Sequence, residues 1–394
     1  MVSILGKKYI LIGIIIAVII VATATYATFM QAPLSSPPQT QQPQQVIQTP
    51  YQQPADRERQ WQLEYERYLK DLYEKARKEG KLTIIGSGVE PLAEVIKKFK
   101  EKYPGIEVSA VFLTPGPLQG RLEAEYKAGK LTMDILNVAC PSPQFKWILD
   151  HGLWVTYRSP LADKLPKEYV VGDVAYAYAA SIFFALAYNK DLVPKDKIPK
   201  SILDFANDAF WRGKIGIGDP RAGGATWTMY YLLYNAYGID LFRKLRENNI
   251  VVTSSADATA RTAAGTLYGG VIIDGHGISR IKLGAPIGII YPEKDPLTPI
   301  IWCTGITKDA ENPNAAKLFI EFLLTEEGQR AIVESGYWSP LYKDLKPLPD
   351  IPNIWQLPNL KIYLPSDWEG YKPVLDAFNM NSTLGEIVKA LGLS

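Results

Sequence analysis

Histidine and cysteine are scarce in this chain of 394 residues, which holds two of each: His151, His276, Cys140 and Cys303. The chain contains no Cys-x-x-Cys pair and no two histidines at ligand spacing, so the patterns typical of a structural zinc site are absent. In an extracellular chain the two cysteines could form one disulfide, and a pair of free buried thiols is the alternative. The sequence predicts no metal site and no cofactor.

An excess of charge of one sign is also missing. The chain has 43 basic and 41 acidic residues, for a formal net charge of +2. This balance gives no reason to expect nucleic acid as a partner. The nucleotide-binding loop Gly-x-x-x-x-Gly-Lys-Ser/Thr, a full Gly-x-Gly-x-x-Gly after a strand, and the hydrolase motif Gly-x-Ser-x-Gly are absent as well. The enzyme alternative that is left is a nucleophilic thiol at Cys140 with His276 as its base. The sequence does not favour an enzyme.

The N-terminal segment is strongly apolar. Lys7 and Lys8 precede an uncharged stretch from Tyr9 to Phe29. A stretch of about 20 apolar residues is long enough to span a bilayer, and the flanking lysines favour a cytoplasmic N-terminus with the rest of the chain outside. Ala22-Thr23-Ala24 offers the alternative of a cleaved signal peptide. Residues 1–30 are therefore predicted to be a membrane anchor or a signal segment.

Residues 31–56 follow as a predicted stalk. From Gln31 to Ala55 the chain has no charged residue and is rich in Gln and Pro, a composition that stays extended and solvated. A stalk favours a retained anchor, and it places the folded part of the chain outside the cell, on the cell membrane. Residues 57–80 then carry apolar side chains at helical spacing, and Gly80 ends the pattern. This helix is expected either to pack on the body or to continue the stalk.

From Leu82 onward, short apolar runs alternate with helical patterns, which predicts an α/β fold with parallel βαβ units. The length and composition of the chain predict two lobes. The predicted strands are 82–85, 106–112, 134–138, 181–188, 214–218 and 270–273. Helices are predicted at 91–103 and 118–128. Proline-rich joints at 194–199 and 286–299 indicate where the chain crosses between the lobes.

Small and polar residues follow most of these strands. In parallel α/β sheets, ligands bind outside the carboxyl ends of strands, where helix N-termini supply free N–H donors. The alternative is that these serines and aspartates only cap helices and the glycines only form turns. The predicted ligand-binding residues in the first lobe are Ser87, Gly88, Thr114, Cys140 and Ser142. Those in the second lobe are Arg221, Gly223, Gly224, Ala225, Thr226, Ser255, Asp274 and His276.

The segment from Arg221 to Thr226 is the most specific of these candidates. Two glycines beside Arg221 and Thr226 at the start of a helix form a cradle suited to an anion. Asp274 could contact an amine or a hydroxyl of the same ligand. These residues predict a small ligand with a phosphate, phosphonate or carboxylate group, and replacement of Arg221 with Ala is expected to weaken its binding more than ten-fold.

Several segments together resemble a known family. They are residues 131–136, 157–160, 187–194, 210–215 followed by Asp219-Pro220, and 312–324 followed by Glu327-Gly328-Gln329. The chain resembles the family 1 extracellular solute-binding proteins of ABC importers, near the iron(III), phosphonate and polyamine binders. The likeness extends over about residues 82–345.

The resemblance implies a type 2 periplasmic-binding-protein fold, in which two lobes close by a hinge around a small molecule in an interlobe cleft. It assigns residues 82–187 plus 286–345 to lobe 1 and 188–285 to lobe 2. Residues 346–394 are expected to pack on lobe 1. It also implies a monomer that delivers its ligand to ABC permease and ATPase subunits. Iron(III) binders of this kind use a tyrosine pair where Gly275-His276 stands here, so iron is the alternative ligand rather than the expected one.

Overall fold

The structure is a computed structural model. It describes residues 54–88, 92–140, 142–182, 184–297, 299–335, 339–340, 342, 344–346, 354–357, 361–362, 370 and 372–393. The chain divides into two units, residues 1–58 and 59–394, and the fold below is that of the second. The predicted anchor and all of the predicted stalk before Pro54 lie outside the described residues. Within the described ranges, no helix has the length and apolar character needed to cross a membrane.

The first sheet has six strands in the order β2-β1-β3-β12-β5-β4. Its parallel strands are β1 (Lys81–Gly86), β2 (Glu107–Phe112) and β3 (Ile135–Cys140). Strand β12 (Pro299–Ile306) pairs antiparallel with β3, and β5 (Ala175–Ile182) pairs antiparallel with β12. Strand β4 (Val170–Val171) pairs antiparallel with β5. The helices of this part are α3 (Leu92–Lys102), α4 (Pro115–Lys127), α5 (Pro143–Asp150), α11 (Pro313–Leu324) and α12 (Glu326–Ser335). The alternation of β1-α3-β2-α4-β3 confirms the predicted βαβ pattern.

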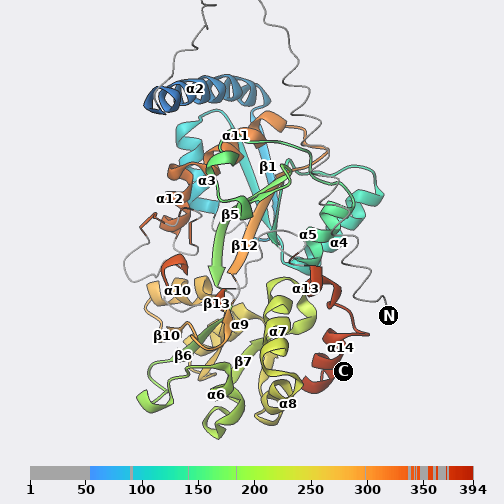
Figure 1. The fold of residues 1–394 in the computed structure, drawn as a ribbon, viewed down its shortest axis with the longest axis vertical. Helices are drawn as coiled ribbons and strands as arrows, with labels where there is room; N and C mark the ends of the chain where they lie inside the picture. The colour runs from blue at the N-terminus through green and yellow to red at the C-terminus, as the bar shows by residue number, and fades with distance from the viewer. Residues whose placement is uncertain are drawn as a thin grey trace, which may run out of the picture. The chain divides into compact units, whose positions relative to one another are not determined.

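The second sheet has five strands in the order β10-β6-β9-β7-β8. Strands β7 (Ile215–Gly218), β8 (Val251–Thr253) and β9 (Gly269–Ile272) are parallel, whereas β6 (Ala185–Asn189) and β10 (Ile287–Ile290) complete the sheet in antiparallel pairings. The helices are α6 (Ile202–Asn207), α7 (Gly224–Tyr237), α8 (Ile239–Glu247), α9 (Ser255–Ala263) and α10 (Asp274–Lys282). Each sheet is grouped with its own helices (Figure 1).

Short elements connect or follow these two groups. Single 3-10 turns are η1 (Ala162–Lys164), η2 (Lys167–Tyr169), η3 (Lys195–Lys197), η4 (Ala209–Trp211), η5 (Pro220–Ala222) and η6 (Ile354–Gln356). A third, two-stranded sheet pairs β11 (Pro296–Leu297) with β13 (Lys361–Ile362), and the C-terminal helices are α13 (Lys372–Asp376) and α14 (Thr383–Leu391).

Two connections join the sheets, and their positions correct the sequence-based boundaries. The predicted strand 181–188 is two strands, β5 in the first sheet and β6 in the second. The outgoing connection is therefore 183–184, not the joint at 194–199. Strand β10 pairs with β6, so 287–290 belongs with the second sheet rather than with lobe 1. The boundary between β5 and β6 could not be recognised in the sequence. Ile182, Phe184 and Ala185 are all fully buried apolar residues, so the chain there resembles a continuous buried strand.

The C-terminal chain was expected to pack on the first part alone, but the structure shows that it packs on both parts. Trp355 does so, because its ring lies 5.9 Å from the ring of Tyr169. Helix α14, in contrast, packs on α8 and α7 of the second part. Its buried residues Leu384, Ile387, Val388 and Leu391 lie on one helical face, and that apolar stripe needs an apolar partner. The partner is the buried face of α8 formed by Leu241, Phe242 and Leu245.

Helix α2 (Pro54–Glu79) packs on the body, which decides between the two expectations for this segment. Tyr65 Oη donates to Glu321 Oε2 at 2.8 Å, and Tyr157 Oη donates to Glu321 Oε1 at 2.5 Å. At the C-terminal end of α2, the Glu79 carboxylate accepts hydrogen bonds from the backbone N–H groups of Asn314 and Ala315 at the start of α11. These part-buried polar contacts hold α2 near its middle and at its C-terminal end.

Cys140 and Cys303 form a disulfide between the neighbouring strands β3 and β12, with Cα atoms 5.9 Å apart. Of the two alternatives left open by the sequence, the structure has the bonded one. The bridge closes a long segment of chain, since the two residues are 163 positions apart.

Candidate functional site

The two sheets present facing edges. In the first sheet, β1, β2 and β3 end at the same edge at which β5 ends and β12 begins, because Ile301 pairs with Cys140 and Pro299 with Ile182. In the second sheet, β7, β8 and β9 end where β6 begins and β10 ends. The chain passes from one edge to the other between β5 and β6 and returns between β10 and β12. The carboxyl ends of both sets of parallel strands therefore point toward each other, which is where a ligand of an α/β protein binds.

The first wall of this region consists of the predicted residues Ser87, Gly88, Thr114, Cys140 and Ser142. Most of them already have a structural role. The Gly88 carbonyl accepts a hydrogen bond from Tyr178 Oη at 2.7 Å. The Ser142 hydroxyl caps α5 by accepting from the Phe145 N–H at 3.0 Å.

The other three residues of the first wall are Ser87, Cys140 and Thr114. Ser87 is only 4% exposed, and the Cys140 sulfur is bonded to Cys303. The alternative of a nucleophilic Cys140 thiol is therefore wrong, and the position of Cys140 in the ligand-binding wall stays a prediction. Thr114 precedes α4, is exposed, and makes no side-chain capping bond. The hydroxyl of Thr114 thus remains available at this wall.

The second wall consists of Arg221, Gly223, Gly224, Ala225, Thr226, Ser255, Asp274 and His276. They lie at the starts of α7, α9 and α10, which follow the three parallel strands β7, β8 and β9. The strands are neighbours in the sheet, so the three helix N-termini are neighbours too. Each contributes a partial positive charge at this edge.

The start of α7 is the least capped of the three. Gly223 is the N-cap and has no side chain to accept from the first-turn N–H groups of Gly224, Ala225 and Thr226. Gly223 takes a positive φ of 72°, which favours glycine over other residues. A Cβ there would lie 3.3 Å from the Phe378 ring, so the backbone is closely flanked by an aromatic side chain.

Arg221 beside this turn is engaged within its own loop. Its Nη2 donates to Asp219 Oδ2 at 2.7 Å, and its Nε donates to Asp219 Oδ1 at 3.0 Å. The contact with the guanidinium lowers the pKa of the Asp219 carboxyl, so this group is ionised and offsets the charge of Arg221. The sequence analysis missed Asp219 as a partner, although a spacing of two residues across Pro220 was visible.

Ser255 and His276 meet at the starts of α9 and α10. Ser255 Oγ accepts a hydrogen bond from the Ile273 N–H at 2.7 Å and lies 3.3 Å from His276 Nδ1. Ser255 Oγ has a second lone pair, so this contact fits either tautomer: the hydroxyl can donate to Nδ1, or a protonated Nδ1 can donate to Oγ. Burial and the nearby Arg280 lower the pKa of His276, so the ring is neutral at pH 7. The Nε2 atom of neutral His276 is therefore a donor in the first tautomer and an acceptor in the second.

The contact of Asp274 with a ligand stays a prediction, and its carboxylate has partners within the protein. It is 4% exposed, and both carboxylate oxygens already accept hydrogen bonds. Oδ1 accepts from the Ile182 N–H at 3.1 Å and from the Gly275 N–H at 2.7 Å. Oδ2 accepts from Tyr291 Oη at 3.1 Å. No sequence pattern pointed to Tyr291, because this contact joins segments that are close only in the folded chain.

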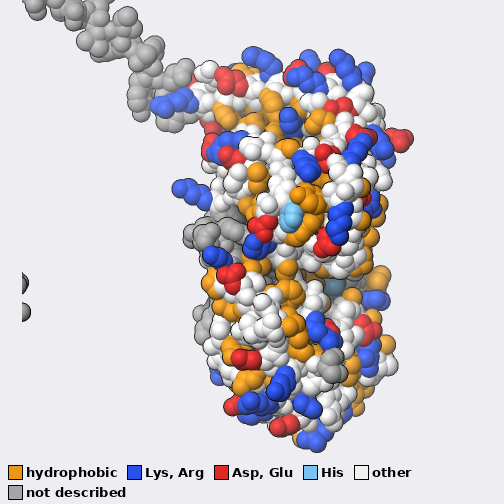
Figure 2. Space-filling view, turned by 90° about the vertical axis from the view of Figure 1, so that its right-hand side faces the viewer, with side chains coloured by type: hydrophobic (Ala, Val, Ile, Leu, Met, Phe, Trp, Pro, Cys, Tyr) orange, Lys and Arg blue, Asp and Glu red, His pale blue; other side chains and the backbone are white. Residues whose placement is uncertain are grey.

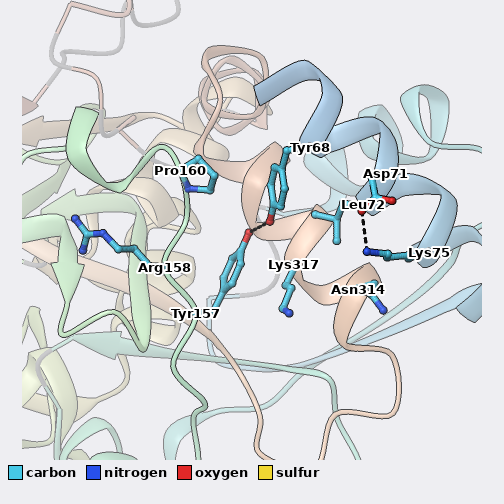
Figure 3. Close-up of a pocket in the computed structure, with 9 residues that line it drawn as sticks. All are labelled: Tyr68, Asp71, Leu72, Lys75, Tyr157, Arg158, Pro160, Asn314 and Lys317. Carbon is cyan, nitrogen blue, oxygen red and sulfur yellow. Dashed lines mark hydrogen bonds and ion pairs between the residues drawn. The ribbon is translucent and has the colours of Figure 1, made fainter. Parts of the chain in front are cut away.

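A surface pocket of about 270 Å³ lies away from these two walls, between α2, the segment 157–160 and α11 (Figure 3). Its tyrosines contact each other, with the hydroxyls of Tyr68 and Tyr157 2.7 Å apart. Lys75 and Arg158 at its rim pair with aspartates. The Tyr68–Tyr157 contact joins α2 to the body, and none of the predicted ligand-binding residues lines this pocket.

Charge on the face drawn in Figure 2 is mixed, with basic and acidic side chains interspersed over both halves. Among the described ranges, no group of three or more His, Cys, Asp or Glu residues is arranged to hold a metal ion.

The comparison with known proteins identifies the family. Residues 94–361 match the family described as bacterial extracellular solute-binding protein. The chain belongs to this family, which confirms the resemblance drawn from the sequence. The family consists of solute-binding proteins, not enzymes. An uncharacterized protein of Haemophilus influenzae is 24% identical over 285 residues, which cover 66% of this chain and 78% of that protein.

Solved structures share the two-lobe α/β fold. The substrate-binding protein of an ABC transporter from Agrobacterium tumefaciens is 18% identical, with a TM-score of 0.66 over 80% of this chain and 96% of that one. The periplasmic binding protein AfuA from Actinobacillus pleuropneumoniae, with fructose-6-phosphate bound, is 20% identical, with a TM-score of 0.64 over 80% and 99%. Iron-bound HitA from Pseudomonas aeruginosa is 19% identical, with a TM-score of 0.61 over 79% and 97%.

Proposed function

We propose that this chain is the substrate-binding subunit of an ABC uptake transporter and binds a small anionic solute, phosphorylated or of phosphonate type, in a cleft between the first and second walls. The observation that carries the proposal is the uncapped start of α7. Its first-turn N–H groups have no side-chain cap and lie at the edge where solutes bind in such folds.

His276 supports the same ligand chemistry. In the tautomer in which the Ser255 hydroxyl donates to Nδ1, the neutral imidazole has its proton on Nε2 and can donate to an oxygen of the solute. Strand β9, before His276, is the neighbour of β7, before the α7 turn, so both donors belong to adjacent strand ends. Arg221 contributes less than the sequence suggested, because Asp219 already holds its guanidinium.

The relatives favour two ligand classes. AfuA was solved with fructose-6-phosphate, and HitA with iron. A phosphate ester matches backbone N–H donors and an imidazole N–H, whereas iron(III) requires several oxygen donors. The sequence has Gly275-His276 where the iron binders have their tyrosine pair. An anionic solute is therefore the first proposal and iron(III) the second.

Delivery requires a permease with its ATPase subunits, and the apolar residues 1–30 are proposed to hold a monomeric binding unit at the outer face of the cell membrane. Retention of the full chain in the membrane fraction, together with release of a chain that lacks residues 1–30, would support the anchor. Recovery of the full chain as a shortened soluble protein would show cleavage instead.

Thermal unfolding of the full chain against a panel of solutes tests the proposal. The panel holds inorganic phosphate, a phosphonate, fructose 6-phosphate, a polyamine and ferric citrate. A solute at 100 times its dissociation constant stabilises the folded state by about 2.7 kcal/mol, which raises the unfolding temperature measurably. We expect a phosphorylated or phosphonate solute to respond. A response to ferric citrate alone would contradict the anionic-solute proposal and favour iron.

A further inference from the structure

Asp274 contacts both connections between the two sheets. Ile182, whose N–H donates to Asp274 Oδ1, is the last residue of β5 before the outgoing connection. Tyr291, whose hydroxyl donates to Oδ2, is the first residue of the return connection after β10. Asp274 itself begins α10 in the second part. One carboxylate thus joins the outgoing segment, the return segment and a helix of the second lobe.

We propose that Asp274 is a hinge-positioning residue whose carboxyl group controls the equilibrium between the observed arrangement of the two lobes and a more open one. Any rotation of one lobe relative to the other must twist the chain between β5 and β6 and between β10 and β12, because the chain passes between the two sheets at these places. Such a twist separates Asp274 from Ile182 or from Tyr291, and water then replaces the lost donor. The proposal rests on the two-lobe fold and not on which solute is bound.

Protonation of Asp274 is coupled to this equilibrium. In the observed arrangement burial raises the pKa of Asp274 to about 7, although the hydrogen bonds from Tyr291, Gly275 and Ile182 oppose the rise. In an open arrangement, with the carboxyl solvated, the pKa returns toward its ordinary value near 3.9. The observed arrangement binds the proton more tightly, so it is favoured at low pH. Its advantage is lost between about pH 4 and pH 7 and stays lost above that range.

Other ionisable groups on the elements packed against Asp274 respond differently. Burial raises the pKa of Tyr291 and of Tyr176, so both stay neutral in this range. Burial lowers the pKa of His276, so protonation of this residue would favour opening at low pH, which is the opposite sign. The remaining ionisable groups on these elements are Tyr178 on β5, Asp257 and Arg261 on α9, and Arg280 and Lys282 on α10.

The distance between the lobes, measured without any solute, tests the proposal in the full chain. Nitroxide labels on Lys97→Cys in α3 and Arg243→Cys in α8 report this distance, since the native side chains are 63% and 60% exposed. The native cysteines are joined in a disulfide and take no label. Pulsed electron paramagnetic resonance then gives the ratio of short-distance to long-distance populations at pH 5 and at pH 8.

We expect that ratio to fall at least tenfold from pH 5 to pH 8 in the otherwise wild-type protein. Asp274→Asn, which cannot ionise, should abolish the dependence. The matched control is Asp134→Asn, at a 2% exposed aspartate whose hydrogen-bond donors, Thr83 and Asn312, both lie in the first lobe. It should keep the full response. A ratio that does not change with pH, a change of opposite sign, or an unaltered response in Asp274→Asn would overturn the proposal.

Tyr291→Phe provides an independent test that keeps the carboxyl group, in case Asp274→Asn does not fold. The lost hydroxyl is a donor that lowers the pKa of Asp274, so its removal should move the pH response to higher pH. An unmoved response in a folded Tyr291→Phe protein would contradict the hinge role. Because no solute is present, these outcomes are independent of the result of the solute panel.

Discussion

The first and second walls face the same region but use their polar groups differently. At the first wall, the Ser142 hydroxyl caps α5, the Gly88 carbonyl accepts from Tyr178, and Cys140 is bonded to Cys303. At the second wall, the first turn of α7 has no side-chain cap, and one nitrogen of His276 contacts Ser255 while Nε2 is the other polar atom of the ring. Three of the five first-wall residues thus have structural partners, with Thr114 at the uncapped start of α4 as an exception, whereas the second wall contains the uncapped start of α7.

This difference teaches that position after a strand does not by itself define a binding residue. Both walls satisfy the rule that small polar residues follow parallel strands, and only the hydrogen-bond partners distinguish them. Substitutions in the first wall should mainly change stability, and those in the second wall should mainly change solute affinity. The following predictions test that division.

Removal of the disulfide should have the largest effect on stability. Replacing Cys140 and Cys303 together with Ala releases a constraint on residues 163 apart, and we expect a loss of about 4 kcal/mol in the free energy of unfolding. Denaturant unfolding of the full chain measures it. A loss below about 1 kcal/mol would show that the bridge contributes little to the first wall.

Gly88→Ala should destabilise the first wall by about 3 kcal/mol. Gly88 has a φ of +73°, and an added Cβ would lie 2.3 Å from the Trp302 ring, so backbone strain and overpacking act together. Gly116→Ala is the matched control, since nothing lies within 4 Å of a Cβ at that position. Equal stabilities of the two variants, measured by denaturant unfolding, would contradict the packing described for Gly88.

His276→Gln should weaken binding of the responding solute about tenfold, or ~1.4 kcal/mol, because the donor at Nε2 is displaced. Its first-wall counterpart is Ser142→Ala, which removes a helix cap and should cost about 1 kcal/mol of stability with affinity within twofold of wild type. Isothermal titration and thermal unfolding of both variants separate the two effects. A reversed pattern would place the binding groups on the first wall.

Arg221→Gln should have the smallest effect, with affinity for an anionic solute reduced less than threefold. Asp219 already neutralises the guanidinium. We therefore expect a smaller loss of affinity than the more than tenfold loss that the sequence alone predicted. Asp219→Asn releases Arg221 and should tighten binding of the same solute. A loss above tenfold in Arg221→Gln, measured by titration, would restore Arg221 to the site.

Much of the fold was predictable from the sequence. The strands β1, β2, β3, β7 and β9 coincide closely with apolar runs bounded by glycine, proline or polar residues. The boundary between β5 and β6 was not predictable from the sequence, because the buried chain at this boundary has the same apolar residues as the strands on either side. The packing partner of α14 was also not predictable, since an apolar stripe shows that a helix is packed but not against which element.

The candidate site was predictable as a set of positions and not as a set of roles. Helix starts after strands pointed to His276 and Ser255, which the structure brings into contact, and to the α7 turn, which follows a neighbouring strand. The engagement of Arg221 by Asp219 and of Asp274 by Ile182 and Tyr291 depends on side-chain geometry. The Asp274 contacts also join residues that lie 92 and 17 positions apart, so no local pattern encodes them.

The most direct test of the proposed function is isothermal titration of the full chain with a pair of solutes that differ only in a phosphate group, such as a sugar and its phosphate ester. The account predicts that only the phosphate ester binds, and that His276→Gln weakens it about tenfold. Equal affinity for the neutral sugar, or binding of ferric citrate with neither member of the pair, would contradict it.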